Sequence, residues 1–412
     1  MSRALTAQQP QHLAQESHYR VVVVGGGDAG ISVASRLQNA GERDVAVIEP
    51  NDSHYYQPLW TLVGGGLVDV RKTIRREESV LPKHATWIRD RCVDVDPYAR
   101  LVTTADGLRV GYDRLVVAPG IQLDWGLTPG LNEALASPHA SSNYDVRLAP
   151  KTWEIMRDLR RGTAVFTMPR GPVKCPGAPQ KIAYLCADHW RQRGVLRDIR
   201  VVLALPGDGL FGIPVFAEAL AKTVAKYGIE VRFNTEPVEF DADSRQITLL
   251  DSTTGVKERL DYDVVHTAPK QSAPDWLKVS PLADPTNTGG FVDVDPHTLQ
   301  HVRHPAVFAL GDAANTPNSK TGAAVRRQAP VVVANVLASL AGRPPAAQYD
   351  GYAACPFTTT RNRMLLAEFD YTMTHRPSFP LIDTTKERYD MWLLKRYGLP
   401  FAYWHLLLRG HA

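Results

Sequence analysis

Two G-x-G-x-x-G loops, each lying between a β-branched strand and a helical segment, predict an α/β fold with two Rossmann-like domains. The first loop follows residues 20–24, which read RVVVV, and the second follows residues 199–205, which read IRVVLAL. A third observation concerns the end of the chain, where aromatic residues and leucines are flanked by cations. This composition predicts a C-terminal amphipathic segment that attaches to a membrane surface.

The first loop carries the full arrangement expected of a dinucleotide site. Gly25, Gly27 and Gly30 allow a tight turn and let the backbone approach a pyrophosphate at the start of a helix. A second strand follows at residues 45–48 and ends in Glu49, where an acid is expected to bind the ribose hydroxyls. Because strand, glycines, helix and acid occur in this order, a glycine-rich turn without a ligand is the weaker interpretation.

Two later segments favour FAD over NAD. Residues 112–120 predict a strand that ends in a small-residue turn containing Ala118 and Gly120. Residues 307–313 predict another strand, which ends in Gly311 and Asp312 at the start of a helix. Flavoproteins with two dinucleotide-binding domains carry both kinds of segment, and such motifs count only in this context.

The second loop has the glycines of a nicotinamide site but not its acid in the expected place. Gly207, Gly209 and Gly212 precede a helix at residues 215–226, and Glu230 follows. Glu230 begins its strand, whereas Glu49 closes its own. We therefore expect a Rossmann-like domain that keeps its shape without a ligand, with an NAD(P)H site as the alternative.

Composition excludes several classes of protein. The net charge of +4 comes without a polybasic run, so nucleic acid is not an expected partner. Four cysteines without C-x-x-C do not predict a metal site, and no apolar run reaches the roughly 18 residues of a membrane span. The expected divisions are a flexible arm (1–18), a cofactor domain in two parts (19–148 and 286–345), a second Rossmann-like domain (149–285) and a C-terminal region (346–412).

Cys175 and Cys355 are the candidates for redox chemistry. Each precedes a proline, and both are expected in Pro-rich turns, unlike the ordinary buried cysteines of apolar segments. Lys174 and a nearby helix start would favour the Cys175 thiolate, which is the nucleophilic form. Cys92, in a predicted strand, and Cys186, in a predicted helix, are interpreted as buried structural residues.

With these motifs, the chain resembles the sulfide:quinone oxidoreductases, in the branch that includes the mitochondrial enzymes. The resemblance extends from about residue 18 to residue 410. Its most specific segments are HYYQPLWTLVG (54–64), PVKCPGAPQK (172–181), SKTGAA (319–324), YDGYAACP (349–356), LAEFDY (366–371) and PFAYWHLLLRG (400–410).

The resemblance implies a mechanism based on two cysteines. Sulfide attacks a Cys175–Cys355 disulfide, one cysteine becomes a persulfide, and two electrons pass through FAD to ubiquinone or menaquinone. A thiol, sulfite or polysulfide then takes the sulfane sulfur. By this analogy Cys355 lies nearer the flavin and Cys175 carries the persulfide.

The resemblance also assigns binding residues and a location. The FAD site would comprise Gly25, Gly27, Asp28, Ala29, Gly30, Glu49, Gln57, Val93, Ala118, Gly120, Gly311, Asp312, Lys320 and Thr321, the last two beginning a helix. The quinone site would comprise Phe357, Trp392, Phe401 and Trp404. Two C-terminal helices, broken near Gly398, would hold a peripheral protein, possible as a homo-oligomer, on the cytoplasmic face of a bacterial inner membrane. A mature mitochondrial protein fits the same interpretation.

Three other functions remain open at this point. An NADH:quinone oxidoreductase of the same fold would need no cysteine pair. A flavocytochrome-type sulfide dehydrogenase would usually be exported, and the first residues lack the apolar core of a signal peptide. A flavin-bound sulfide or persulfide sensor would show flavin reduction without turnover.

Overall fold

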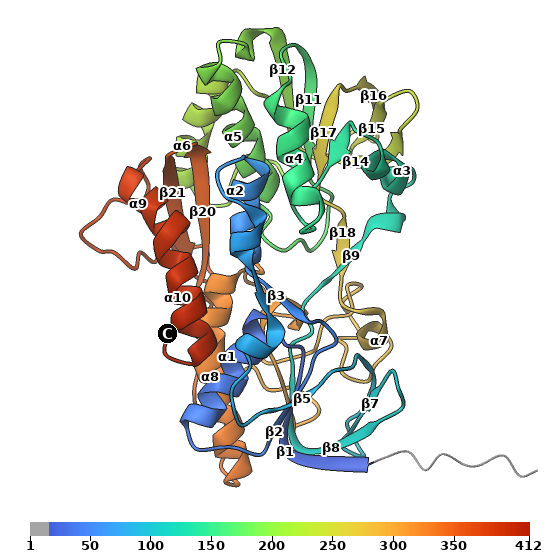
Figure 1. Ribbon diagram of the computed structural model, residues 1–412, viewed down its shortest axis with the longest axis vertical. Helices are drawn as coiled ribbons and strands as arrows, with labels where there is room; N and C mark the ends of the chain where they lie inside the picture. The colour runs from blue at the N-terminus through green and yellow to red at the C-terminus, as the bar shows by residue number, and fades with distance from the viewer. Residues whose placement is uncertain (1–15) are drawn as a thin grey trace, which may run out of the picture.

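The computed structural model describes residues 16–412 and shows two lobes that are linked by a narrow ribbon (Figure 1). The lower lobe contains the first glycine loop, and the upper lobe contains the second. Residues 1–15 of the predicted arm lie outside the described residues, whereas residues 16–18 belong to the first strand.

The first lobe is built on a seven-stranded sheet with the valine-rich strand at its centre. This strand, β1 (Glu16–Val24), pairs in parallel with β2 and β8, and residues 21–24 are almost fully buried. A continuous apolar run suits such a position because both faces of the sheet are covered. In sheet order the strands are β5 (Thr86–Ile88), β2 (Val45–Ile48), β1, β8 (Arg109–Val117), β7 (Leu101–Thr104) and β6 (Cys92–Asp96), with β19 (Val307–Ala309) beside β8.

Two helices from distant parts of the chain pack side by side on this sheet. They are α1 (Asp28–Asn39) and α8 (Gly322–Leu340), the latter capped by the Thr321 hydroxyl, which accepts from the Ala324 amide. Residues 307–313 form β19 and a 3-10 turn rather than a strand leading into a helix, since α8 starts only at Gly322. The long helix nevertheless points its first turn at the first turn of α1, because a Cβ on Gly322 would lie 3.0 Å from the Asp28 carboxylate.

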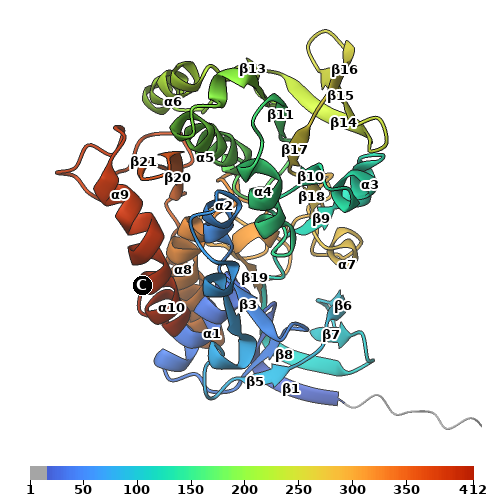
Figure 2. The same cartoon turned by 45° about the horizontal axis from the view of Figure 1, so that its top comes forward.

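The second lobe is a smaller parallel sheet with helices around it (Figure 2). Its strand order is β10 (Ala140–Ser141), β17 (Val264–Thr267), β11 (Gly162–Thr167), β12 (Ile199–Ala204) and β13 (Glu230–Arg232). An antiparallel sheet at its outer corner contains β14 (Thr235–Asp241), β15 (Gln246–Asp251) and β16 (Lys257–Asp261). Its helices are α3 (Leu131–Ala136), α4 (Leu148–Arg157), α5 (Ala178–Gln192) and α6 (Pro214–Tyr227).

The lobes are joined by a ribbon of β9 (Gln122–Asp124) and β18 (Lys270–Ser272). The second lobe therefore spans residues 125–269, which differs from the expected 149–285. The strand β10 precedes residue 149 and completes the second sheet, while α7 (Asp275–Lys278) packs Leu277 into the first core. Short strands and isolated turns carry too little periodicity to show which core they join.

The C-terminal region lies along one edge of both lobes (Figure 1). It begins with a hairpin of β20 (Ala353–Thr360) and β21 (Arg363–Phe369) and ends with α9 (Tyr389–Leu393) and α10 (Leu399–His405). The predicted break near Gly398 is absent, because a π-helical turn at Leu394–Gly398 joins α9 to α10 and absorbs Pro400. Between residues 16 and 412, every helix is too short or too polar to cross a bilayer.

The remaining short elements pack near the first glycine loop. They are β3 (Ser53–Tyr55) and β4 (Ile74–Arg76), whereas α2 (Trp60–Gly64) packs on α4 and α5 of the second lobe. The hairpin of β3 and β4 carries Tyr56 and His54 to the inner side of α10, where they contact Tyr403 and Trp404. These contacts fix the C-terminal helices to the first lobe.

Candidate active site

Cys175 lies at the carboxyl edge of the second parallel sheet, in the loop between β11 and α5. This edge is where ligands and reactive groups gather in open α/β sheets. Its backbone has φ of +49°, in the left-handed region, which costs a non-glycine residue roughly 1–2 kcal/mol. The amide donates to the Lys320 carbonyl (3.1 Å), so the loop touches the segment that leads into α8.

Cys355 reaches the same place from the C-terminal hairpin. The expectation of a Pro-rich turn is wrong for this residue, because Cys355 lies inside β20 with only 4% of its surface exposed. Pro356 is tolerated because β20 belongs to a two-stranded ribbon, where one edge of each strand needs no partner. A Cβ on Gly177 would lie 3.1 Å from the Cys355 sulfur and 2.6 Å from the Phe357 ring, so the two segments meet at van der Waals contact.

A buried lysine completes this cysteine site. Lys181, in the first turns of α5, is 1% exposed, and its Nζ lies 3.3 Å from the Cys175 Sγ and 5.3 Å from the centre of the Phe357 ring. A hydrogen bond from Cys355 and the charge of Lys181 hold the pKa of Cys175 well below its ordinary value. The hydrogen bond to Cys175 and burial raise the pKa of Cys355. The two sulfurs therefore titrate as a pair, and the Lys181 ammonium at 3.3 Å stabilises a thiolate on Cys175.

A second lysine enters the site from the C-terminal helices. Lys395, in the π-helical turn, is 3% exposed and donates to the Pro58 carbonyl (3.2 Å). Burial, and then repulsion from Lys181, lower its pKa to about 7, while the two cysteines oppose that shift. Sequence reasoning assigned no role to Lys181 or Lys395. A lysine on the buried face of an amphipathic segment is the signal that could have revealed the second of them.

The other two cysteines are buried, as their settings predicted. Cys92, in β6, and Cys186, in α5, are both buried, and burial raises the pKa of each thiol to about 12. Neither thiol is a cause of the pKa shifts of Cys175 and Cys355.

The first glycine loop has the shape required to receive a diphosphate. A Cβ on Gly30 would lie 1.8 Å from the Gly25 carbonyl, and one on Gly25 would lie 2.3 Å from the Ala118 carbonyl, so both positions require glycine. Gly27 faces open space, because a Cβ at this position would meet no neighbouring group within 4 Å. No side chain caps the start of α1, which leaves its first amides free for an anion.

Two acids stand on either side of this loop. Glu49 closes β2, is 8% exposed and accepts hydrogen bonds from Gly26 (2.7 Å) and from the Asn51 amide (2.8 Å). Asp28, in the first turn of α1, has a carboxyl oxygen that is buried without a partner. Burial and repulsion from Asp312 raise the pKa of Asp28 to about 8, so that this group is mostly a neutral acid at pH 7.

The remaining predicted cofactor residues line the space between α1 and α8. Gly120 and Gly311 have φ of +78° and +70°, and Gly120 faces open space. Burial lowers the pKa of Lys320 to about 8, and its Nζ donates to the Asp312 carbonyl (2.7 Å) and the Ala314 carbonyl (3.0 Å). Gly311 packs against the Ala29 side chain, since a Cβ there would lie 3.1 Å from it.

The last two predicted cofactor contacts lie farther from the loop. Val93 stands in a bulge of β6, because the pairing with β7 shifts between Cys92 and Asp94, so its backbone is left out of the ladder. Gln57 is exposed at the start of a short 3-10 turn, Gln57–Leu59. Their roles toward a cofactor stay predictions.

The four aromatic residues assigned to a quinone do not share one cluster. Phe357 packs beside the cysteines, Trp392 lies under β21 with Met364 and Leu366, and Trp404 packs on Tyr56. Phe401 is 61% exposed on the outer side of α10. Of the four, only Phe357 belongs to the cysteine site in this structure.

The second glycine loop has become part of the protein's own packing. Glu230 is paired with Arg200 (2.9 Å) and Arg232 (2.9 Å), so its carboxylate is already engaged. Phe211, from the same loop, packs against Phe357 (5.3 Å between ring centres) and Phe369 (5.5 Å). These contacts place the loop against the hairpin that carries Cys355, and the expectation that it holds no nucleotide stays a prediction.

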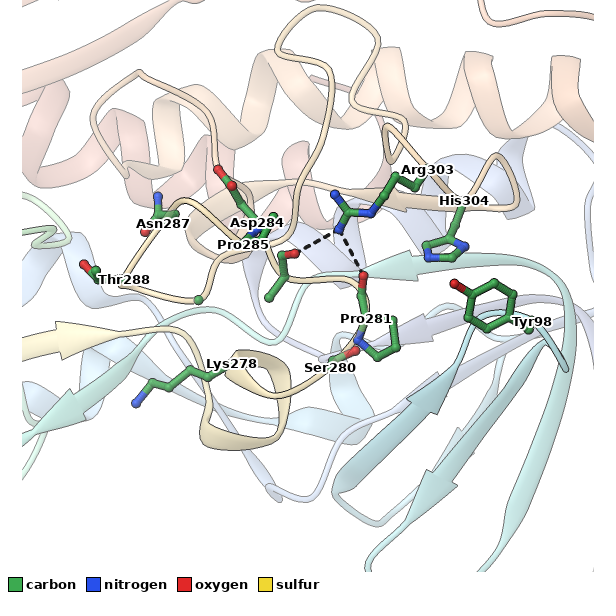
Figure 3. Close-up of a pocket in the computed structure, with 12 residues that line it drawn as sticks. Tyr98, Lys278, Ser280, Pro281, Asp284, Pro285, Asn287, Thr288, Arg303 and His304 are labelled. Atoms are coloured by element: carbon green, nitrogen blue, oxygen red, sulfur yellow. Dashed lines mark hydrogen bonds between the residues drawn. The ribbon is translucent and has the colours of Figure 1, made fainter.

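A separate open cavity of about 710 Å³ lies on the first lobe (Figure 3). Tyr98, Lys278 and His304 stand around it, and Arg303 donates to the carbonyls of Pro281 (3.1 Å) and Ala283 (3.0 Å). The cavity shares no lining residue with the cysteine site. The Arg303 guanidinium at its edge holds the surrounding loop through these hydrogen bonds.

The donor set between α1 and α8 suits a flavin dinucleotide better than a metal or a lone phosphate. It combines free helix amides for a diphosphate, a strand-terminal acid for a ribose and an open floor at Gly27 and Gly120. The cysteine pair adjoins this space through the Cys175–Lys320 hydrogen bond. A planar redox group at this position would therefore lie next to a thiolate.

Comparison with known proteins agrees with this geometry. Residues 19–152 and 182–329 match the pyridine nucleotide-disulphide oxidoreductase family. The mitochondrial sulfide:quinone oxidoreductase of Mus musculus is 39% identical over 96% of this chain and 88% of its own length. That of Dictyostelium discoideum is 40% identical over 95% of this chain and 86% of its own length.

Solved structures show the same fold. The sulfide:quinone oxidoreductase of Aquifex aeolicus is 21% identical, with a TM-score of 0.81 over 96% of this chain and 92% of that one. The predicted α/β fold with two Rossmann-like sheets is confirmed, as is the family resemblance drawn from the motifs. Because these two relatives are 39% and 40% identical over nearly the whole chain, the chain belongs to the sulfide:quinone oxidoreductase family, within the pyridine nucleotide-disulphide oxidoreductases.

Proposed function

We propose that this protein oxidises sulfide through a Cys175–Cys355 disulfide and passes two electrons by way of FAD to a membrane quinone. The observation that carries the proposal is the meeting of three distant segments at one point. Cys175 comes from the second lobe, Cys355 from the C-terminal hairpin, and the Lys320 carbonyl from the approach to α8. A pair of thiols that served only packing would not hold a buried ammonium at 3.3 Å.

The residues would divide the chemistry as follows. Hydrosulfide attacks the Cys355 sulfur, the disulfide bond breaks, and Cys175 leaves with the electron pair as a thiolate. Lys181 stabilises that thiolate, and a thiol with the lower pKa is the better leaving group. This reverses the division expected from resemblance, and the contact of Cys175 with the flavin-side Lys320 supports the reversal.

The cycle closes when the persulfide loses its outer sulfur. A thiol, sulfite or second sulfide attacks that sulfur and leaves Cys355 as a thiol or thiolate. Bound flavin supplies the two-electron relay from the two cysteines to a quinone. With those electrons gone, the Cys175–Cys355 bond forms again.

We further propose that the C-terminal region rests on the membrane that holds the quinone. Leu381 (98% exposed), Tyr397 (60%) and Phe401 (61%) project from the loop 370–388 and the C-terminal helices, and Arg396 and Arg409 flank them. Exposed aromatics and leucines with neighbouring cations suit the interface of an anionic bilayer. Since Lys395 on the same helices reaches the cysteines, a quinone could enter the site along this edge.

Anaerobic titration with sulfide tests the proposal. Flavin absorbance should fall with sulfide and recover on addition of a short-chain quinone. Both responses should be lost in Cys175→Ala and Cys355→Ala. Persulfide on Cys355 after sulfide addition, located by mass spectrometry, would support the division of roles, and persulfide on Cys175 would contradict it. Reduction by NADH without any response to sulfide would refute the proposal.

A further inference from the structure

The left-handed backbone of Cys175 needs an explanation from its surroundings. Non-glycine residues with positive φ are uncommon, and the residue before a proline is pushed further toward extended conformations. Cys175 is both, since Pro176 follows it. Strain of this kind persists at functional sites only where neighbouring groups hold it.

Three hydrogen bonds hold the Cys175 peptide groups. The amide donates to the Lys320 carbonyl (3.1 Å), and the carbonyl accepts from the Ala178 amide (2.9 Å). The second lone pair of that carbonyl accepts from the Tyr144 hydroxyl (3.0 Å). The first two bonds come from backbone, so Tyr144 is the side chain that fixes this residue.

Tyr144 is itself held firmly in place. It follows β10, and the Cys175 loop follows β11, so both reach the carboxyl edge of the same parallel sheet. Its ring is 4% exposed among Val173, Ala178 and Ala268. The preceding residue is anchored by the Asn143 amide, which donates to His266 Nε2 (3.0 Å).

The hydroxyl of Tyr144 remains a donor whatever the charge of the cysteines. Burial, and then the Cys175 and Cys355 charges, raise the pKa of Tyr144 well above its ordinary value. It therefore keeps its proton when a thiolate forms beside it, and its bond to the Cys175 carbonyl persists through the cycle.

We propose that Tyr144 is a positioning residue for the reactive thiol. By donating to the Cys175 carbonyl, its hydroxyl holds the left-handed backbone that directs the Cys175 sulfur toward Lys181 and Cys355. This inference deepens the proposed function. The part of its test that uses sulfide rests on that function. Without this bond the Cys175 loop relaxes toward an extended backbone, and the thiol spends less time beside the ammonium.

The test compares Tyr144→Phe with Tyr184→Phe in the flavin-loaded protein. The first variant removes only the hydroxyl, and the Cys175 carbonyl keeps its bond from Ala178, so no buried group is orphaned. Tyr184 is an equally buried tyrosine of α5 whose hydroxyl has no partner, which makes its variant the matched control. Thermal melting establishes that both variants fold.

Two measurements separate positioning from packing. With Tyr144→Phe, iodoacetamide should modify Cys175 of the reduced protein three- to tenfold more slowly at pH 7, as read by mass spectrometry of its peptide. The limiting rate of flavin bleaching by sulfide should fall by a similar factor, while the sulfide concentration at half-maximal rate stays within twofold, because the hydroxyl does not touch sulfide. Tyr184→Phe should leave all three quantities within twofold of wild type.

The inference is overturned if Tyr144→Phe alkylates and bleaches like wild type, even if its melting temperature falls. If wild-type flavin does not respond to sulfide, the proposed function fails, and alkylation of Cys175 alone then decides the role of Tyr144.

Discussion

Replacing Lys181 with methionine should raise the pKa of the Cys175 thiol by about one to two units. The ammonium lies 3.3 Å from the sulfur, so the gross attraction to a thiolate is about 5 kcal/mol at an effective dielectric constant of 20. Exchange with water leaves a smaller net value, roughly 1.5–3 kcal/mol for a hydrogen bond to a charged group. At 1.36 kcal/mol per pKa unit, this net energy corresponds to the rise of about one to two units.

The assay is the pH dependence of iodoacetamide modification of Cys175 in the reduced protein. Methionine retains the length of the side chain, and removing a buried charge is tolerated when the space stays filled. Cys92 and Cys186 serve as internal references, because burial keeps the pKa of each near 12. Lys222→Met, at an exposed position of α6, is the control. A Cys175 midpoint that moves by less than roughly 0.3 unit in Lys181→Met would refute the electrostatic argument.

Three other changes have expected outcomes. Asp28 is protonated at pH 7 and ionises as the pH rises through about 8, so flavin retention, read by released fluorescence, should fall between pH 7 and 9. In Asp28→Asn, flavin retention should not fall over this pH range. Equal losses of flavin from the wild type and the variant would contradict the role of Asp28. Gly177→Ala should drive its new methyl group into the Phe357 ring (2.6 Å) and the Cys355 sulfur (3.1 Å), lowering the free energy of unfolding by about 1–3 kcal/mol in denaturant titrations. If Gly177→Ala were as stable as the wild type, the segments that carry Gly177 and Cys355 would be free to move apart. Phe401→Glu should weaken flotation with anionic vesicles severalfold and leave sulfide bleaching of the flavin intact, and unchanged flotation would move the membrane contact elsewhere.

The burial of the two cysteines bears on which molecule accepts the sulfur from the proposed persulfide. Cys175 is half-buried and Cys355 is almost fully buried, so the persulfide proposed on Cys355 would be shielded from large nucleophiles. A small anion such as sulfite or hydrosulfide fits this geometry best. Comparing turnover with sulfite and with a bulky thiol would decide between them, and faster turnover with the bulky thiol would show that the loop opens.

Local patterns were sufficient for the first glycine loop. Strand β2 ends at Ile48 and is followed by Glu49, as the sequence predicts, because a buried parallel strand, a helix start and a tight turn each leave a local signature. Gly25 and Gly30 are required by contacts within that same unit. The order of these signals was enough to identify the dinucleotide fold and, with the longer motifs, the family.

Local patterns failed where a strand or helix is specified by what it packs against. Cys355 was expected in a turn because proline follows it, but pairing with β21 places it in a buried strand. A break was predicted near Gly398, just before Pro400, yet packing of α10 on the first lobe and a π-helical turn keep the helical path continuous. In both places tertiary contacts outweigh the local preference of proline.

By itself, the sequence determined the two Rossmann-like sheets and the dinucleotide loop, because each is written in residues close together along the chain. It also predicted Cys175 and Cys355 as the redox pair, from the motif around each cysteine. Only the tertiary structure decided that Lys181, Lys395 and Tyr144 surround those cysteines. These three residues come from separate elements, and no spacing within the sequence encodes their meeting. The charge of a buried thiolate and the strain of its backbone depend on such meetings, so the chemistry of the site is a property of the folded chain.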